Sequence, residues 1–221
     1  METLQYVWNL MPALGEGAWE TVKLFVATLV LSLPLGLPFA LGSNSRFKIL
    51  QAICKIYIWI FRGTPLLLQL FFFYFFLPIA FGIRMDAFST ATLTFVLNYA
   101  AYFAEIYRGG INSIDRGQYE AAHSLGLSKG QTMMGIILPQ TMKTILPPVS
   151  NEAIVLIKDT ALVSCIGVAD LMKASESAVN RDVNAMAYLV AAVIYLIFTF
   201  LLTLLSNYLE RRYSVYDAKE D

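Results

Sequence analysis

EAAHSLGLSKGQTMMGIILP, residues Glu120–Pro139, is a polar segment between long apolar stretches, so we expect it to lie outside a membrane. Helix-forming residues open it, and Gly126 and Gly130 interrupt it. The pattern predicts a short helix, a break flanked by Leu125 and Leu127, and a second helical start that stops at the proline. A short exposed helix with apolar residues near its end suits a groove on another protein. The alternative is a solvated loop between two spans.

The composition is that of a helical integral membrane protein. Of the 221 residues, 57% are hydrophobic and 14% are charged, and the mean hydropathy is +0.61. Soluble domains have about 25% charged residues. The net charge is zero, so we expect no nucleic-acid partner. His123 is the only histidine, which argues against a histidine-based metal site.

The apolar stretches predict one transmembrane domain over residues 1–221 with about five helices, embedded in the lipid bilayer of the cell membrane. The expected spans are about 18–42, 51–77, 87–110, 149–168 and 185–208. Residues 1–16 are too polar to span, and we expect an interfacial segment there. We expect residues 115–139, approximately, to form the loop outside the membrane. Pro147 and Pro148 are expected to stop the helix that precedes the fourth span.

Basic residues indicate the orientation of this domain. They concentrate in the connections on one side, at Arg46, Lys48, Arg108, Arg116, Lys129, Lys143, Arg211, Arg212 and Lys219. The connections on the other side hold only Arg84, Lys173 and Arg181. The positive-inside rule therefore predicts that the N-terminus lies outside, and that the 115–139 loop and the C-terminus are cytoplasmic.

Ionisable residues within the predicted spans are the candidate substrate-binding residues. Each costs about 2.5–3.5 kcal/mol at mid-membrane, so a functional role is the first hypothesis. The candidates, with two polar neighbours, are Arg62, Asn98, Tyr102, Glu105, Glu152, Lys158 and Asp159. Asn98 and Glu105 share a helix face, and so do Glu152 and Asp159. If the two faces meet, they form a polar strip that could bind the charged groups of an amino acid.

Several of these residues also have purely structural explanations that compete with substrate binding. Arg62 could reach the membrane interface, and Glu105 could pair with Arg108 at a helix end. Lys158 and Asp159 could neutralise each other or Arg62. Two free carboxylates would favour a cationic substrate, whereas cancelled charges would favour a neutral polar amino acid such as glutamine.

Glu120-Ala121-Ala122, followed at fixed spacing by Gly126, Ile136 and Leu138-Pro139, resembles the EAA loop of ABC importer permeases. Further segments resemble the polar amino acid branch of that family, which includes histidine, glutamine and arginine importers. These segments are Arg62–Leu67, Ala104–Ile111, Gly117-Gln118 and Lys158–Leu162. Together they extend the resemblance from about residue 17 to 212. Ala161 departs from it, because serine is more frequent there in the family.

The resemblance implies an all-α, type I ABC importer permease-like fold with five core helices. It also implies a second permease copy, identical or related, a dimer of ATPase subunits, and an extracytoplasmic amino-acid-binding protein. In that family the EAA loop forms a coupling helix that docks in a cleft of the ATPase. The corresponding residues here are Glu120, Ala121, Ala122, Leu125, Gly126 and Leu127.

The expected function is thus the permease subunit of an ATP-driven importer of polar, foremost basic, amino acids such as arginine, lysine or histidine. The chain has no G-x-x-x-x-G-K-[ST] phosphate loop, so ATP and magnesium are expected on the partner ATPase, with no cofactor or catalytic residue on this chain. The alternatives are a permease for glutamine or other neutral polar amino acids, and an ion-coupled secondary transporter. No inverted repeat is evident to favour the latter.

Overall fold

The computed structural model describes residues 2–214, and all regular elements in that range are helical. In chain order they are α1 (Glu2–Ser43), α2 (Lys48–Gly63), α3 (Leu66–Phe71), the π-helix η1 (Phe72–Phe76), α4 (Leu77–Phe81), α5 (Ala87–Asn112), α6 (Arg116–Ser124), α7 (Lys129–Thr132), the π-helix η2 (Met133–Ile137), α8 (Leu138–Asp159), the 3-10 helix η3 (Thr160–Ile166), α9 (Leu171–Asp182) and α10 (Met186–Ser214).

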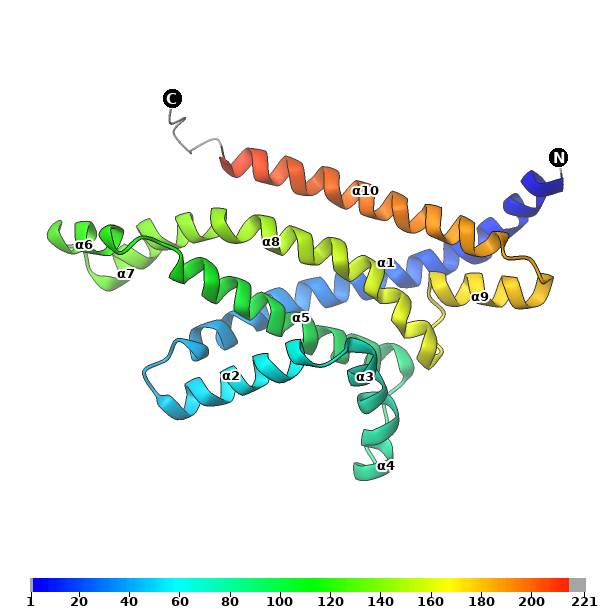
Figure 1. Ribbon diagram of the computed structural model, residues 1–221, viewed down its shortest axis with the longest axis horizontal. Coiled ribbons are helices and arrows are strands. Elements are labelled where there is room, and N and C mark those ends of the chain that lie inside the picture. Colours follow the sequence, from blue (N-terminus) through cyan, green and yellow to red (C-terminus); the bar gives the residue numbers. More distant parts are fainter. Residues whose placement is uncertain (1, 215–221) are drawn as a thin grey trace.

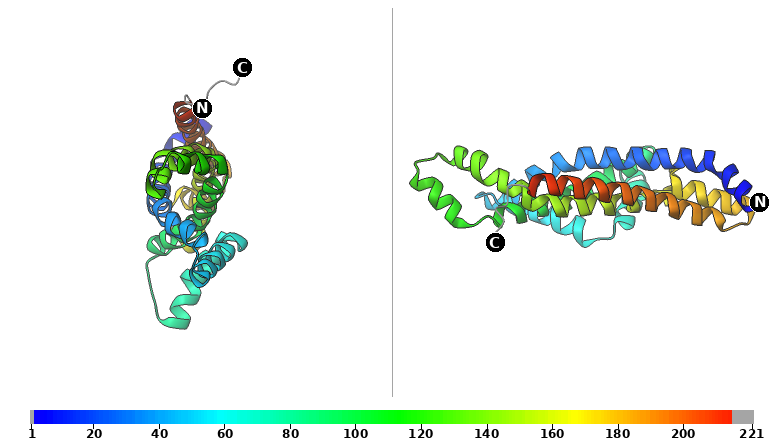
Figure 2. Two further views of the ribbon diagram at one scale, coloured as in Figure 1. Left: turned by 90° about the vertical axis from the view of Figure 1, so that its left-hand side faces the viewer. Right: turned by 90° about the horizontal axis from the view of Figure 1, so that it is seen from above.

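Four long helices, α1, α5, α8 and α10, run lengthwise in an elongated bundle (Figures 1 and 2). α1 packs against α5 and α9, while α10 packs against α8 and α9. α6 and α7 lie at one end of the bundle, and α9 lies at the other end beside the start of α1 (Figure 1). The segment α3–α4 leaves the body of the bundle sideways.

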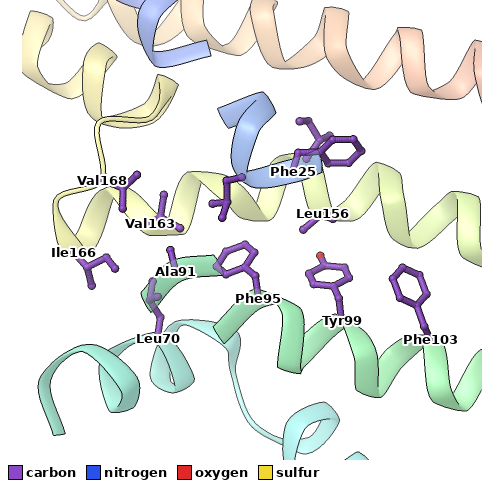
Figure 3. Close-up of a cluster of buried hydrophobic side chains, with 12 residues drawn as sticks. Phe25, Leu70, Ala91, Phe95, Tyr99, Phe103, Leu156, Val163, Ile166 and Val168 are labelled. Atoms are coloured by element: carbon purple, nitrogen blue, oxygen red, sulfur yellow. The ribbon is translucent and has the colours of Figure 1, made fainter. Parts of the chain in front are cut away.

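The main core lies where α1, α5 and the end of α8 meet. α5 supplies its largest buried side chains, Phe95, Tyr99 and Phe103, which point toward α8 in Figure 3. Leu24 and Leu156 are fully buried against them from α1 and α8. A second core joins the first part of α1 to α9 and α10. In the main core, α5 is held between α1 and α8, which fixes the face that carries the candidate residues.

Within residues 2–214, two helices are long and apolar enough to cross a membrane alone, over Leu4–Ser43 and Met186–Tyr213. The pair α2 and α3–α4 qualifies as a third if it counts as one span, although it bends by 106° at the break between them. α5 and α8 do not qualify alone; α5 is largely buried among its neighbours. The count of five spans and their boundaries stay a prediction.

The helices differ from the expectations at three places. Residues 2–16 belong to α1, which continues through them without a break; their expected place at the membrane interface stays a prediction. The expected span 51–77 is not one straight helix: Thr64, which precedes Pro65, adopts the extended conformation that proline imposes. The expected stop at Pro147 and Pro148 is absent, since α8 runs through both. Membrane helices tolerate interior prolines when nearby groups satisfy the freed carbonyls.

Candidate functional site

A polar cavity of about 550 Å³ opens beside the break between α2 and α3. It is lined by residues of α2 and α3 on one side and of α5, α8 and η3 on the others. These are Arg62, Gly63, Thr64, Pro65, Leu66, Asn98, Tyr99, Tyr102, Glu152, Val155, Asp159 and Leu162. The structure thus brings together five of the seven predicted substrate residues; Glu105 and Lys158 are the other two.

The helix break leaves a carbonyl that the cavity wall must satisfy. The helical partner of the Phe61 carbonyl would be the amide of residue 65, but Pro65 has no N–H. The side-chain amides of Gln69 and Asn98 replace it, donating to Phe61 O at 2.9 Å and 3.0 Å. Asn98 also donates to Gln69 Oε1 at 2.9 Å. The amide donors of Asn98 are therefore engaged in holding the break.

The acidic wall of the cavity comes from α8. Glu152 and Asp159 are seven residues apart, so they lie on one face of the helix, as the sequence predicted. The hydroxyl of Tyr99 donates to Asp159 Oδ2 at 2.8 Å. Glu152 has neither a hydrogen bond nor an ion pair with any residue between 2 and 214, so its carboxylate is open to a ligand.

The opposite wall carries one cation, Arg62, at the end of α2. Its guanidinium carbon lies 5.3 Å from the centre of the Tyr102 ring, and Nη1 is 3.9 Å from Glu105 Oε1. Glu105 also pairs with Arg108, one turn further along α5, which donates from Nε to Oε2 at 2.9 Å and from Nη2 to Oε1. Glu105, which does not line the cavity, thus has two guanidinium neighbours, and Arg108 is much the closer of the two.

Lys158 does not line the cavity either. It is exposed, because adjacent positions on a helix point about 100° apart and Asp159 takes the inward direction. Sequence reasoning also missed Tyr99 and Thr64. Tyr99 lies next to Asn98 on α5 and reads as an aromatic core residue; only the approach of α8 shows that its hydroxyl meets a carboxylate.

The EAA loop forms two short helices with well-defined ends. Asp115 caps α6, accepting from the Gly117 amide at 2.6 Å. Gly126, with φ of +72°, closes α6: its amide donates to His123 O at 2.9 Å, and the Leu127 amide donates to Ala122 O at 3.1 Å. These paired bonds form a Schellman motif, which requires a left-handed residue at this position.

The predicted coupling residues differ in accessibility. Glu120, Ala121 and Leu125 are exposed, and Leu125 has 78% of its surface accessible. Ala122 is buried within the chain itself, so it is not part of an open docking face. Leu127 is half-buried. The expected end at Pro139 is also wrong, because α7, η2 and α8 are consecutive and the proline occupies the first turn of α8.

Residues 32–215 match the family described as binding-protein-dependent transport system inner membrane component. The chain belongs to this family. It is 38% identical over 219 residues to the L-cystine transport system permease protein TcyB of Bacillus subtilis, covering 96% of this chain and 93% of that protein. It is 39% identical over 203 residues to the arginine transport system permease protein ArtQ of the same organism, covering 91% and 93%. It is 37% identical over 211 residues to the glutamine transport system permease protein GlnP of Escherichia coli K12, covering 95% and 96%.

Solved structures of ABC transporters also resemble this chain. A chain from a crystal structure of an amino acid ABC transporter with histidines superposes with a TM-score of 0.88 at 36% identity, covering 96% of this chain and 97% of that one. A chain of the inward-facing MetNI methionine ABC transporter gives 0.79 at 18% identity, covering 93% and 98%, and supports the fold alone.

The predicted family and all-helical membrane permease fold are therefore confirmed. The chain is a multi-pass inner-membrane subunit of an ABC transporter, and the nucleotide is bound and hydrolysed by separate ATPase subunits. This excludes a secondary transporter that carries its own energy coupling.

Proposed function

We propose that this chain forms the transport path of an ATP-driven importer of polar amino acids, with basic amino acids preferred. The substrate binds in the cavity between the α2–α3 break, α5 and α8. The observation that carries the proposal is the arrangement of its charges: Arg62 on one wall faces Glu152 and Asp159 on another. Its volume of about 550 Å³ lies within the range of about 300–1,000 Å³ of small-molecule sites.

A basic amino acid matches these charges group by group. It has one carboxylate, which Arg62 would bind, and two cationic groups, one for each carboxylate on α8. Glu105 does not disturb the balance, because Arg108 neutralises it. A neutral amino acid such as glutamine is the second candidate. The hydrogen bond from Tyr99 to Asp159 favours it, since that bond partly satisfies one of the two carboxylates.

Energy reaches the cavity from the α6–α7 end of the bundle. We place the ATPase subunits on the exposed side of α6, with Glu120, Ala121 and Leu125 in contact and Gly126 setting the end of the helix. A second permease copy would enclose the path, and an extracytoplasmic binding protein would deliver the amino acid. Closure of the ATPases would then move α6 and switch the helices between inward-open and outward-open states.

The test is thermal unfolding of the permease purified with its ATPase, in the presence of arginine, lysine, histidine or glutamine. A ligand of the folded state stabilises it by RT ln(1 + [L]/Kd), about 2.7 kcal/mol at a hundredfold excess over Kd. Glu152→Gln keeps the size of the side chain and removes its charge. We expect arginine and lysine to bind about tenfold or more weakly, because a charge-assisted hydrogen bond contributes about 1.5–3 kcal/mol. Glutamine should lose less.

Glu176→Gln is the matched control. Glu176 is a partly exposed carboxylate on α9 that pairs with Lys173 away from the cavity. This variant should keep the wild-type ligand profile. Equal loss of basic and neutral ligands in Glu152→Gln, or no loss, would remove Glu152 from the recognition site.

A further inference from the structure

A second cavity, of about 400 Å³, lies between the α1–α2 connection and the EAA loop. Its lining combines basic groups with apolar and hydroxyl side chains: Arg46, Tyr119, His123, Leu127, Lys129, Thr132 and Met133. Arg46 comes from the connection, Tyr119 and His123 from α6, and the remainder from α7 and its flanks. α6 and α7, which supply most of this lining, lie at one end of the bundle (Figure 1), whereas the amino acid cavity is lined by the α2–α3 break, α5, α8 and η3.

The cavity borders the membrane surface. Arg46 lies in the four-residue connection between α1 and α2, both of which contribute to candidate spans. So short a connection keeps the adjoining ends of the two spans on the same side of the membrane. The flanking Phe47 and Ile49 are 77% and 79% exposed, as expected of side chains that contact lipid. Asn44 Nδ2 donates to Asn112 Oδ1 at 3.3 Å, which ties the connection to the end of α5, just before α6.

The charge of this cavity is not compensated within the described chain. None of its lining residues is acidic. Arg46 and Lys129 form no ion pair with any residue between 2 and 214, whereas Lys23, Lys173 and Arg181 elsewhere each pair with a carboxylate. Two neighbouring cations without an anion repel each other. An anionic group bound between them would relieve that repulsion.

We propose that this cavity binds the phosphate headgroup of an anionic phospholipid from the adjacent leaflet. Basic pockets beside transmembrane helices at the cytoplasmic surface suit such headgroups. Arg46 and Lys129 neutralise the phosphate, the hydroxyls of Tyr119 and Thr132 are available as donors, and the acyl chains continue along the exposed apolar side chains of α2. The inference rests on the proposed cytoplasmic position of the EAA loop, and it makes this loop responsive to the lipid beside it.

The test is native mass spectrometry of the intact transporter with phosphatidylglycerol or phosphatidylcholine. We expect selective retention of phosphatidylglycerol. Arg46→Gln combined with Lys129→Gln should weaken it about thirtyfold, since each basic residue near an anionic surface contributes about fivefold. Arg116→Gln, which removes an exposed charge of α6 outside the cavity, should leave retention unchanged. Arg46→Lys, which keeps the charge, should retain most of the binding.

Four results would overturn the proposal. Equal retention of the two lipids would show that no anionic site exists, and an equal loss in Arg116→Gln would show only diffuse attraction. Displacement of the lipid by millimolar inorganic phosphate would assign the cavity to a free anion. Loss of ATPase subunits from the double variant, with lipid retention unchanged, would assign the basic groups to an acidic surface of the ATPase. Each result is independent of amino acid binding, so the proposed function stands or falls by its own test.

Discussion

Gly126 is the residue on which the end of α6, the proposed coupling helix, depends. Its φ of +72° lies in the left-handed region, where a β-branched side chain is strongly disfavoured. Gly126→Val should therefore unwind the last turn of α6 and displace Leu125, its most exposed apolar side chain. We expect uptake to fall at least tenfold while the amount of protein in the membrane is unchanged, measured as radiolabelled uptake against immunoblot signal.

Gly130→Val is the control for that substitution. Gly130 lies four residues further on, in α7, and has open space where a Cβ would be added and no left-handed backbone. The same side chain there should be tolerated. Uptake at the wild-type rate in Gly126→Val would contradict a role of this turn in coupling.

The sequence predicted the charged residues of the cavity better than its other polar residues. Glu152 and Asp159 could be grouped because helix geometry alone places positions seven apart on one face. Tyr99 could not be found, since its role depends on α8 lying opposite α5. Asn98 lines the cavity as well, but the sequence did not show that its amide replaces the N–H that Pro65 lacks, because no local pattern links residues 37 positions apart.

At the scale of elements, helix ends were the least predictable feature. The EAA loop carried its own signals, because Asp115, Gly126 and Ser128 are residues that cap or terminate helices wherever they occur. Proline, in contrast, did not reliably predict where a helix ends. Pro65 breaks a helix, whereas Pro147 and Pro148 do not. At the break, the side chains of Gln69 and Asn98 donate to the carbonyl that Pro65 leaves free, and such a tertiary contact cannot be inferred from the local sequence.

The contact between α1 and α9 offers a direct test of packing between elements. A Cβ on Gly17 would lie 2.8 Å from Asp170 O and 2.9 Å from both Leu171 Cα and Ala174 Cβ. Gly17→Ala should therefore push α9 away from α1. Overpacking of this kind costs about 1–3 kcal/mol, and we expect the apparent melting temperature in detergent to fall by several degrees.

Gly15→Ala is the matched variant on the same helix. Nothing lies within 4 Å of a Cβ at Gly15, so alanine there should leave the melting temperature unchanged or raise it slightly through its higher helix propensity. Equal melting temperatures for the two variants would show that α9 is not packed on α1 in the folded protein.

On the scale of the whole molecule, the two proposed roles of the chain, amino acid binding and coupling to the ATPase, belong to different parts of the bundle. The amino acid cavity is lined by the α2–α3 break, α5, α8 and η3, whereas α6 and α7 lie at one end of the bundle (Figures 1 and 2). α8 connects them, because it begins at the end of the EAA loop and carries Glu152 and Asp159 toward its other end. α7, η2 and α8 follow one another directly, so we expect a movement of α7 to reach the carboxylates through consecutive helical turns, whereas α6 joins them through the connection 125–128.

That coupling requires the EAA loop to be on the side of ATP, which makes orientation the most informative property to measure. In a background with Cys54 and Cys165 replaced by serine, Ser124→Cys marks α6 and Asn180→Cys marks α9; both positions are exposed. The basic residues beside the EAA loop predict that it is cytoplasmic. A membrane-impermeant maleimide should therefore label only Asn180→Cys in intact cells and both variants after permeabilisation. Because α6 and α9 lie at opposite ends of the bundle, each variant serves as the control for the other (Figure 1). Labelling of Ser124→Cys in intact cells would place α6 outside, beyond the reach of an ATPase, and would refute both the proposed coupling route and the proposed orientation.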